Sequence, residues 1–222
     1  FERFSTQFGT AASNPGLDAE RATHYEIGGS RVLGVVTIEA AAFHSDIGKA
    51  IVAIRPAAAP AGVSQRRNLG DARYSGAEAS ATARIAPTLL LGANYSYIHR
   101  HFTIRPRPGV VPPPAFELTD VPAHKGFAYA VWSPTARLRI APSIEAVSNR
   151  ATLASTTPTP PGIPRYYRTG RYVQGNVRID CEVIDGVEIG VGGRNLFDDD
   201  HQLVDGFPEA GRSIFASIRA RY

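Results

Sequence analysis

The feature that most limits the possible folds of this chain is a two-residue alternation of apolar and polar side chains. Successive side chains of a β-strand point to opposite faces, so such alternation predicts a strand with one apolar face. In the segment 172–183, one face carries Val173, Val177, Ile179, Cys181 and Val183, and the other carries Gln174, Asn176, Arg178, Asp180 and Glu182. The last residues repeat the pattern and end in Tyr222. No segment keeps a 3.6-residue apolar period, which predicts little helix.

Nine runs of this kind follow one another along the chain, and the connections between them alternate in length. The expected strands are 22–29, 32–55, 70–85, 89–98, 124–132, 138–150, 172–183, 187–195 and 211–222, with an irregularity near 45–48. Short turns at 30–31, 86–87, 133–137 and 184–186 alternate with long segments at 56–67, 102–122, 151–167 and 198–210. An up-and-down sheet places all the short turns at one end and all the long loops at the other, as transmembrane barrels do.

Composition excludes several other classes of protein. The 222 residues contain no apolar stretch long enough for a transmembrane helix. The single cysteine, Cys181, excludes an internal disulfide and is expected to be inert filler of an apolar face. The net charge is +4, but the arginines are scattered rather than clustered, which argues against nucleic-acid binding.

Four ordered segments carry a resemblance to a known family. They are Asn14-Pro15-Gly16-Leu17-Asp18-Ala19-Glu20 with Tyr25-Glu26-Ile27-Gly28, Asn68-Leu69-Gly70 through Gly76-Ala77-Glu78, Gly193-Arg194-Asn195-Leu196-Phe197-Asp198, and Gly206-Phe207-Pro208-Glu209-Ala210-Gly211-Arg212. In this order they resemble the C-terminal part of the barrel of TonB-dependent outer-membrane receptors. Two positions depart from the family pattern: Ala19, where Pro is usual, and Ala210.

The resemblance implies an all-β fold, an antiparallel up-and-down transmembrane β-barrel of which residues 1–222 are an incomplete C-terminal part of about nine strands. The plug domain and the N-terminal strands are then expected to be absent.

The implied function is TonB-linked, energised uptake of a metal chelate, such as a siderophore or a cobalamin-like ligand, across the outer membrane of a Gram-negative bacterium. The implied partners are the TonB complex through the missing plug, the outer-membrane lipid, and the barrel assembly machinery through the last strand. Neither catalysis nor a cofactor is expected. The alternatives are a passive porin-like or structural barrel and a soluble β-sandwich binding module.

The motif residues are expected to be structural. They are Asn14, Pro15, Glu20, Asn68, Gly70, Gly76, Glu78, Asn195, Leu196, Phe197, Gly211, Arg212 and Tyr222. Gly70 and Gly76 within a strand predict a bulge or the close approach of another segment. Glu78 is expected to face the lumen and to pair with an arginine such as Arg84. The Asn195–Asp198 segment is expected to end a strand through side chain to backbone hydrogen bonds.

Candidate ligand contacts lie in the long loops. They are Arg105, Arg107, Phe116, Arg165, Tyr166, Tyr167 and Arg168, since cationic and aromatic side chains suit an anionic, planar metal chelate. The alternative is that they are ordinary polar loop residues. His99 with His101, and Asp198 to Asp200, lack the further ligands that a zinc or calcium site needs, so no metal site is expected. Other aromatic residues are expected at strand ends or on the lipid-facing side: Tyr95, Tyr97, Phe102, Phe127, Tyr129, Trp132 and Tyr172.

Overall fold

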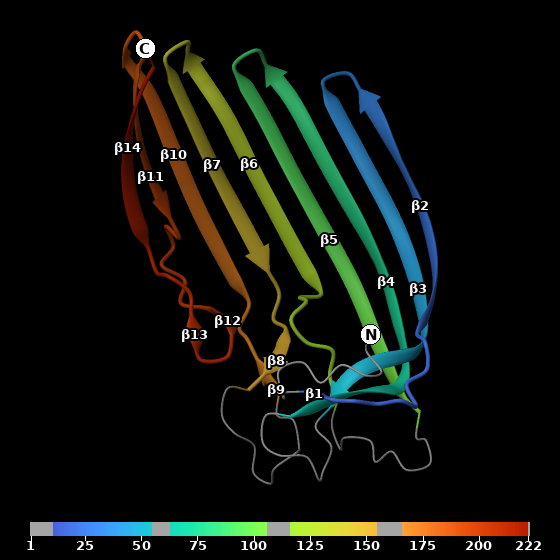
Figure 1. Cartoon of the computed structure of the whole chain (residues 1–222). Helices are drawn as coiled ribbons and strands as arrows, with labels where there is room; N and C mark the ends of the chain where they lie inside the picture. The colour runs from blue at the N-terminus through green and yellow to red at the C-terminus, as the bar shows by residue number, and fades with distance from the viewer. Residues whose placement is uncertain (1–10, 55–62, 106–115, 155–165, 222) are drawn as a thin grey trace.

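The computed structural model describes residues 11–54, 63–105, 116–154 and 166–221. Nine of its strands form one curved sheet in the order β14-β11-β10-β7-β6-β5-β4-β3-β2, with β2 and β14 at its two edges (Figure 1). Each neighbouring pair in this path is antiparallel. The strands are β2 (Arg21–Leu33), β3 (Val36–Ile54), β4 (Ser64–Ala86), β5 (Leu89–Ile104), β6 (His124–Thr135), β7 (Leu138–Val147), β10 (Tyr172–Ile184), β11 (Val187–Arg194) and β14 (Ser213–Ala220).

Five further strands are short. β8 (Ala151–Leu153) pairs with β9 (Tyr166–Arg168), and β12 (Gln202–Val204) pairs with β13 (Phe207–Pro208). β1 (Ala11–Ala12) lies parallel to the start of β4, which is the exception to antiparallel pairing among the described strands. All five lie at the end of the sheet opposite the short turns (Figure 1), so the long connections build a separate layer there. We call this end the loop end and the other the turn end.

The first short turn is not where the sequence predicts it. β2 continues through residues 30–31 to Leu33, which pairs with Val36, and the turn consists of Gly34 and Val35. Gly34 has a φ of 61°, a left-handed value that glycine adopts without steric cost. The irregularity expected near residues 45–48 is present as a register shift between Ile47 and Ala50, and Lys49 there has a φ of 57°.

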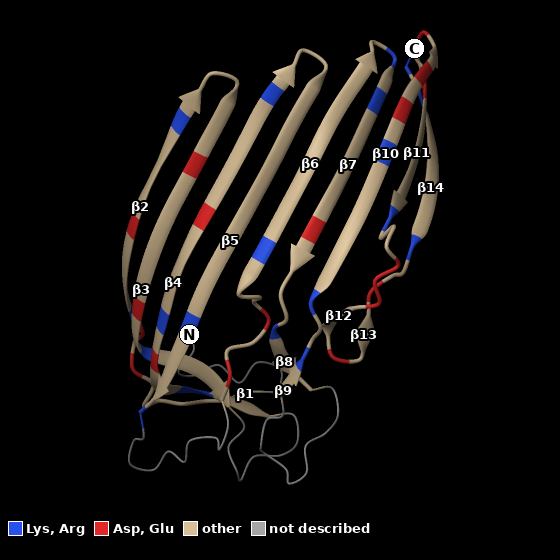
Figure 2. Cartoon of the chain, turned by 180° about the vertical axis from the view of Figure 1, so that it is seen from behind, with Lys and Arg blue, Asp and Glu red and all other residues tan. Residues whose placement is uncertain are grey.

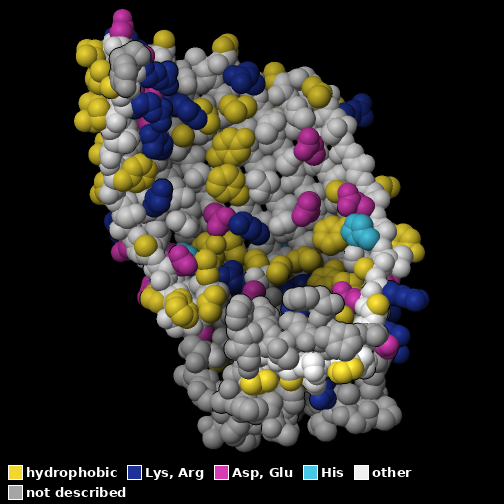
Figure 3. Space-filling model, in the orientation of Figure 1, with side chains coloured by type: hydrophobic (Ala, Val, Ile, Leu, Met, Phe, Trp, Pro, Cys, Tyr) yellow, Lys and Arg dark blue, Asp and Glu magenta, His cyan; other side chains and the backbone are white. Residues whose placement is uncertain are grey.

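The two faces of the sheet differ in chemistry. Apolar side chains stand on the convex, outer face without any cover: the exposed fraction is 78% for Ile27, 85% for Ile214 and 77% for Ile218. Charged residues are spread along the strands rather than confined to the loops (Figure 2). Viewed into its hollow, the sheet shows many of these charged side chains (Figure 3). Among the described residues there is no helix long and apolar enough to cross a membrane.

Four aromatic residues face inward rather than toward the outer surface. Phe127 pairs in register with Glu145, and Tyr129 lies over Gly92, whose missing side chain leaves room for the ring. Tyr172 and Phe102 also belong to the inner face. The strand-end position expected for them holds for Tyr172, the first residue of β10, and for Phe102, near the end of β5. The expectation of a strand-end or lipid-facing position is wrong for Phe127 and Tyr129, which lie within β6. It fits Tyr95, Tyr97 and Trp132, which are exposed on the outer face.

Candidate functional site

The inner face of the sheet is held by ion pairs between neighbouring strands. Lys125 on β6 pairs with Glu145 on β7 at 2.9 Å, and the Tyr172 hydroxyl of β10 donates a hydrogen bond to the same carboxylate at 2.8 Å. Farther along the sheet, Arg219 on β14 pairs with Glu188 on β11 at 3.1 Å. Opposite charges therefore compensate one another on the concave face of the sheet.

Glu78 belongs to the same inner face. It pairs in register with Ala41 and Ser96, and its side chain is exposed. The structure shows no ion pair between Glu78 and another described residue, so the expected pair with Arg84 is not formed.

A cavity of about 520 Å³ lies at the loop end, beside the outer part of β5. Its walls come from three parts of the chain: β5, the segment that leads into β6, and the β8–β9 pair. The lining residues are Tyr97, Ile98, His99, Arg100, His101, Phe102, Phe116, Glu117, Leu118, Val121, Ala123, His124, Asn149, Arg150, Ala151 and Arg168. Of these, Tyr97, His99 and His101 belong to the outer face of β5, so the cavity reaches the edge of that face. The cavity thus combines aromatic rings, three arginines and one carboxylate.

Contacts between these walls fix the shape of the cavity. The rings of Phe102 and Phe116 lie with their centroids 4.5 Å apart. Arg168 Nη2 pairs with Glu117 Oε2 at 3.1 Å and so ties β9 to the segment before β6. Arg100 donates hydrogen bonds to the carbonyl oxygens of residues 119 and 121, at 3.1 and 2.6 Å.

The structure brings together part of the predicted ligand set. Phe116 and Arg168 line the same cavity, and Tyr166 and Tyr167 lie on the same short strand as Arg168. Burial raises the pKa of the Tyr166 hydroxyl, and a hydrogen bond with the backbone of Glu117 offsets part of this rise. Arg105 lies apart, in an ion pair with Asp71. Arg107 and Arg165 lie outside the described residues.

Several cavity residues were not predicted from the sequence. Phe102 and Arg100 were missed because the fifth strand was expected to end at residue 98, whereas β5 runs to Ile104. Alternation does continue through this part of the strand: even-numbered residues 98–104 are half-buried and odd-numbered ones are exposed. Extending the two-residue pattern past His99 would have placed both side chains on the inner face.

Asn68 joins two of the family-like motifs. Its side-chain amide donates to the carbonyl oxygens of Asp18 at 3.0 Å and Lys49 at 2.7 Å, and its side-chain oxygen accepts from the Asp18 amide at 2.8 Å. Glu20 adds a contact by accepting a hydrogen bond from the Ile51 amide at 2.8 Å. Asn68 is buried, with 7% of its surface exposed. The segment before β2 is therefore fastened across β3 and β4 at the loop end.

Gly70 and Gly76 both lie where another strand approaches closely. A Cβ at Gly70 would overlap the carbonyl oxygen of Thr103 on β5, and one at Gly76 would overlap that of Tyr97. Gly70 also pairs with Ala50 at the register shift of β3. Asn14, in the same region, donates a hydrogen bond to the carbonyl oxygen of Arg66 at 2.8 Å, and Pro15 follows it in the turn before Leu17.

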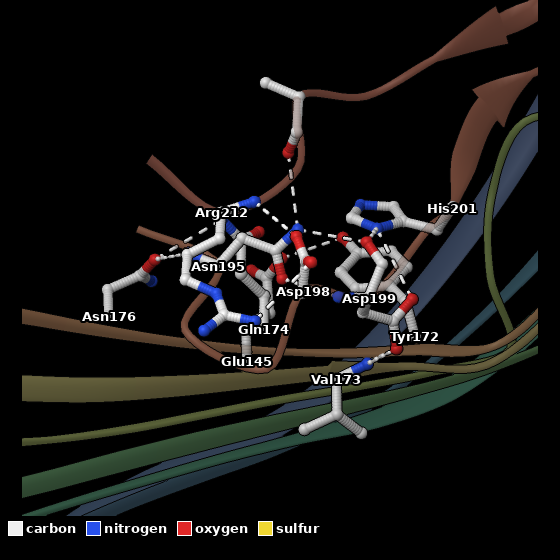
Figure 4. A network of polar contacts seen from close by, with 11 residues as sticks. Glu145, Tyr172, Val173, Gln174, Asn176, Asn195, Asp198, Asp199, His201 and Arg212 are labelled. Atoms are coloured by element: carbon white, nitrogen blue, oxygen red, sulfur yellow. Dashed lines mark hydrogen bonds and ion pairs between the residues drawn. The ribbon is translucent and has the colours of Figure 1, made fainter. Parts of the chain in front are cut away.

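A second network fastens the segment between β11 and β14 (Figure 4). Asn195 has 1% of its surface exposed and a φ of 49°. Its side chain donates to the carbonyl oxygens of Asp199 at 3.0 Å and Ala210 at 3.3 Å and accepts from the Asp199 amide at 3.0 Å. Its own amide donates to the side chain of Asn176 on β10 at 3.1 Å.

The same network extends in two directions from Asn195. Toward β14, the Asp198 carboxylate accepts a hydrogen bond from the Arg212 amide at 2.8 Å, close beside Gly211. Toward β10, the ring of His201 stacks on Tyr172 with centroids 4.0 Å apart. These contacts anchor the returning chain onto the sheet.

The two other residues of this motif lie against small neighbours. Leu196 donates its amide to the Gly175 carbonyl oxygen at 2.8 Å and places its side chain beside Gly193. The Phe197 ring lies over Gly175. Tyr222 lies outside the described residues. Within the described part of the chain, no group of three or more His, Cys, Asp or Glu side chains could hold a metal ion.

Comparison with known proteins adds a family match. Residues 1–196 match the family described as TonB dependent receptor-like, beta-barrel. No curated protein matches the sequence.

Solved structures share the fold at low sequence identity. The FrpB iron transporter from Neisseria meningitidis (F3-3 variant) superposes with a TM-score of 0.70 and 17% identity, over 95% of this chain and 32% of that one. The siderophore receptor PirA from Acinetobacter baumannii gives 0.69 and 16%, over 95% and 33%. The copper transporter OprC gives 0.69 and 16%, over 93% and 32%. The chain therefore spans about a third of the length of these proteins.

Proposed function

Because the chain belongs to the TonB-dependent receptor-like β-barrel family, we propose that it forms the C-terminal part of an outer-membrane receptor that imports a metal chelate with energy from the TonB complex. Residues 1–222 then form the later strands of the barrel wall, and the plug and earlier strands belong to the rest of the receptor. The outer face contacts outer-membrane lipid, and the last strand is the signal for the barrel assembly machinery.

The observation that carries this proposal is the opposite chemistry of the two faces of one curved sheet. Bare isoleucine and valine side chains on the outer face suit hydrocarbon, whereas they would favour aggregation in water. Ion pairs such as Lys125–Glu145 and Arg219–Glu188 suit a polar lumen. Structures with this fold include an iron transporter and a siderophore receptor, which supports a metal chelate as cargo.

The loop-end cavity is the proposed contact surface for the chelate. Phe102 and Phe116 offer ring faces, and Arg168 offers a cation that is held in place by Glu117. Such groups suit a planar, anionic chelate of the siderophore type, because rings stack on flat ligands and a guanidinium donates to anionic oxygens.

Growth of a deletion strain tests this function. The gene for the full receptor is deleted and restored, and growth is measured with a single ferric siderophore, cupric chelate or cobalamin as the limiting nutrient. We expect at least one chelate to support growth only with the receptor present and only with a functional TonB. Uptake that continues without TonB would instead support the passive porin alternative and contradict the proposal.

A further inference from the structure

The outer surface of β2 to β5 contains a shallow groove. It has a volume of about 520 Å³ and lies among residues of these four strands. Side chains of the outer face that line it are Ile27, Gly29, Ala40, Ala42, Ala77, Ala79 and Tyr95. Ile27 and Tyr95 are its bulky members, with 78% and 48% of their surfaces exposed, and the positions between them carry only glycine or alanine.

Toward the loop end, the outer face changes abruptly from apolar to polar. Next to the groove, Tyr25, His44, Ser75 and His99 lie in register across the four strands. The following row holds Thr23, Asp46, Arg73 and His101. The groove thus opens toward a polar surface that is rich in hydrogen-bond donors.

Within this polar surface, Arg73 has the greatest capacity to bind an anion. Its Nε pairs with Asp46 Oδ1 at 3.0 Å, while 70% of its side chain is exposed to solvent. His44 uses both ring nitrogens, one with Ser75 Oγ at 2.7 Å and one with Asp46 Oδ2 at 3.0 Å. His99 and His101 are exposed on the same face. Asp46 is the acid within these two rows, and its two oxygens are occupied by the His44 and Arg73 contacts. In the next row toward the loop end, Asp71 lies on the same face as Arg73 and is paired with Arg105.

We propose that this surface binds a phosphorylated lipid of the membrane leaflet at the loop end. One acyl chain lies in the groove between Ile27 and Tyr95, and the phosphate meets Arg73 and His101. The inference rests on the proposed membrane location of the barrel. Each arginine near a membrane surface adds attraction for anionic head groups, and a floor of alanine and glycine lets an acyl chain lie close to the backbone.

A lipid fits this surface better than a protein partner for two reasons. The groove is continuous with the bare apolar face of the sheet, which a membrane already covers. Its polar border also begins at one row of residues, as expected where hydrocarbon gives way to head groups.

Lipid binding to the purified full receptor tests the proposal. Dissociation constants are measured by native mass spectrometry for lipid A, phosphatidylglycerol and phosphatidylcholine, with inorganic phosphate as a further arm. We expect both anionic lipids to bind more tightly than phosphatidylcholine, and free phosphate to bind far more weakly than either. Arg73→Ala should raise the dissociation constant for anionic lipid about fivefold, which is the effect of one arginine near a charged membrane surface.

Two further variants separate lipid binding from a merely structural role. Asp46→Asn removes the acid beside Arg73 and should increase the affinity for anionic lipid. If the ion pair were only structural, Asp46→Asn and Arg73→Ala would lower that affinity equally. Ala79→Leu should lower the affinity for phosphatidylcholine as well as for the anionic lipids, because the larger side chain fills the groove. Arg139→Ala is the matched control, since Arg139 is exposed on the opposite face, in register with Asp180.

Equal affinity of Arg73→Ala and the unchanged receptor for anionic lipid would overturn the inference, as would weaker binding by Asp46→Asn. Chelate uptake is measured on the same variants. Normal uptake combined with no lipid preference overturns this inference alone, while uptake that never depends on the receptor overturns the proposed function.

Discussion

Asn68 and Asp18 exchange two hydrogen bonds, of 2.8 and 3.0 Å, although 50 residues separate them in the sequence. Asp18 lies before the first long strand of the sheet and Asn68 lies within β4. The contact therefore crosses β3, whose residue Lys49 supplies the third partner of the amide at 2.7 Å.

Asn68→Ala should destabilise the receptor because it removes three side-chain hydrogen bonds to the backbone of Asp18 and Lys49. We expect a loss of about 1–3 kcal/mol in the free energy of unfolding, the usual cost of unsatisfied buried polar groups. Urea unfolding of the full receptor in lipid vesicles measures it. Asn94→Ala is the control, since Asn94 is exposed on the inner face. Equal effects of both changes would show that the contact adds nothing.

Gly76→Ala should be more harmful than the same change at Gly29. A methyl group at Gly76 meets the Tyr97 carbonyl oxygen and the Phe43 ring, whereas one at Gly29 meets no atom within 4 Å. We expect about 1–3 kcal/mol of destabilisation at Gly76 and a neutral or slightly stabilising effect at Gly29. Thermal unfolding distinguishes them. If alanine were tolerated at Gly76, that would contradict the close approach of Phe43 on β3 and Tyr97 on β5 to this position of β4.

Asn195→Ala should loosen the segment between β11 and β14. The change removes the side-chain contacts to Asp199 and Ala210, and the left-handed backbone at this position suits asparagine better than alanine. We expect faster proteolysis of residues 196–212 in intact cells, measured by mass spectrometry of the released peptides. Asp200→Asn, at an exposed site, should leave the rate unchanged. Unchanged cleavage in Asn195→Ala would show that the anchor lies elsewhere.

Phe116→Ala and Arg168→Ala should reduce uptake of the chelate with the barrel intact. Each change removes one wall contact of the loop-end cavity, and loss of one stacked or ionic contact weakens binding about tenfold. Uptake of the labelled chelate as a function of its concentration measures the half-saturating value. Arg137→Ala, at the turn end near Asp185, is the matched control. An effect as large for Arg137→Ala as for Arg168→Ala would contradict a ligand role for the cavity.

Local alternation was enough to predict the nine strands and their order, because each strand pairs with its neighbour in sequence. Exact ends were harder to predict. Residues 28–34 contain three glycines, and the sequence favours a turn at 30–31, yet pairing of Leu33 with Val36 extends the hairpin to Gly34. The position of the turn is therefore set by the backbone pairing of β2 with β3, which is a contact between strands and not a local preference of the turn residues.

The candidate cavity was less predictable than the fold. The sequence indicated aromatic and cationic loop residues, but Phe116 contacts Phe102, and Arg168 contacts Glu117, only after three distant segments meet. Arg105 is likewise a cationic residue predicted to lie in a long loop, but it pairs with Asp71 instead of lining the cavity. The chemistry of a loop residue was therefore visible in the sequence, while its partner depended on the tertiary arrangement.

The most direct test of the central claim is the accessibility of successive residues along β10 in a membrane. In the full receptor with Cys181→Ser, single cysteines replace residues 173–180 in turn, and each carries a spin label in lipid vesicles. Collision with oxygen, which concentrates in hydrocarbon, and with a water-soluble nickel complex is measured at every position. The account predicts high oxygen and low nickel accessibility at Val173, Val177 and Ile179, and the reverse at Gln174, Asn176 and Arg178. Nickel accessibility that is the same on both faces, or high on the valine face, would contradict it.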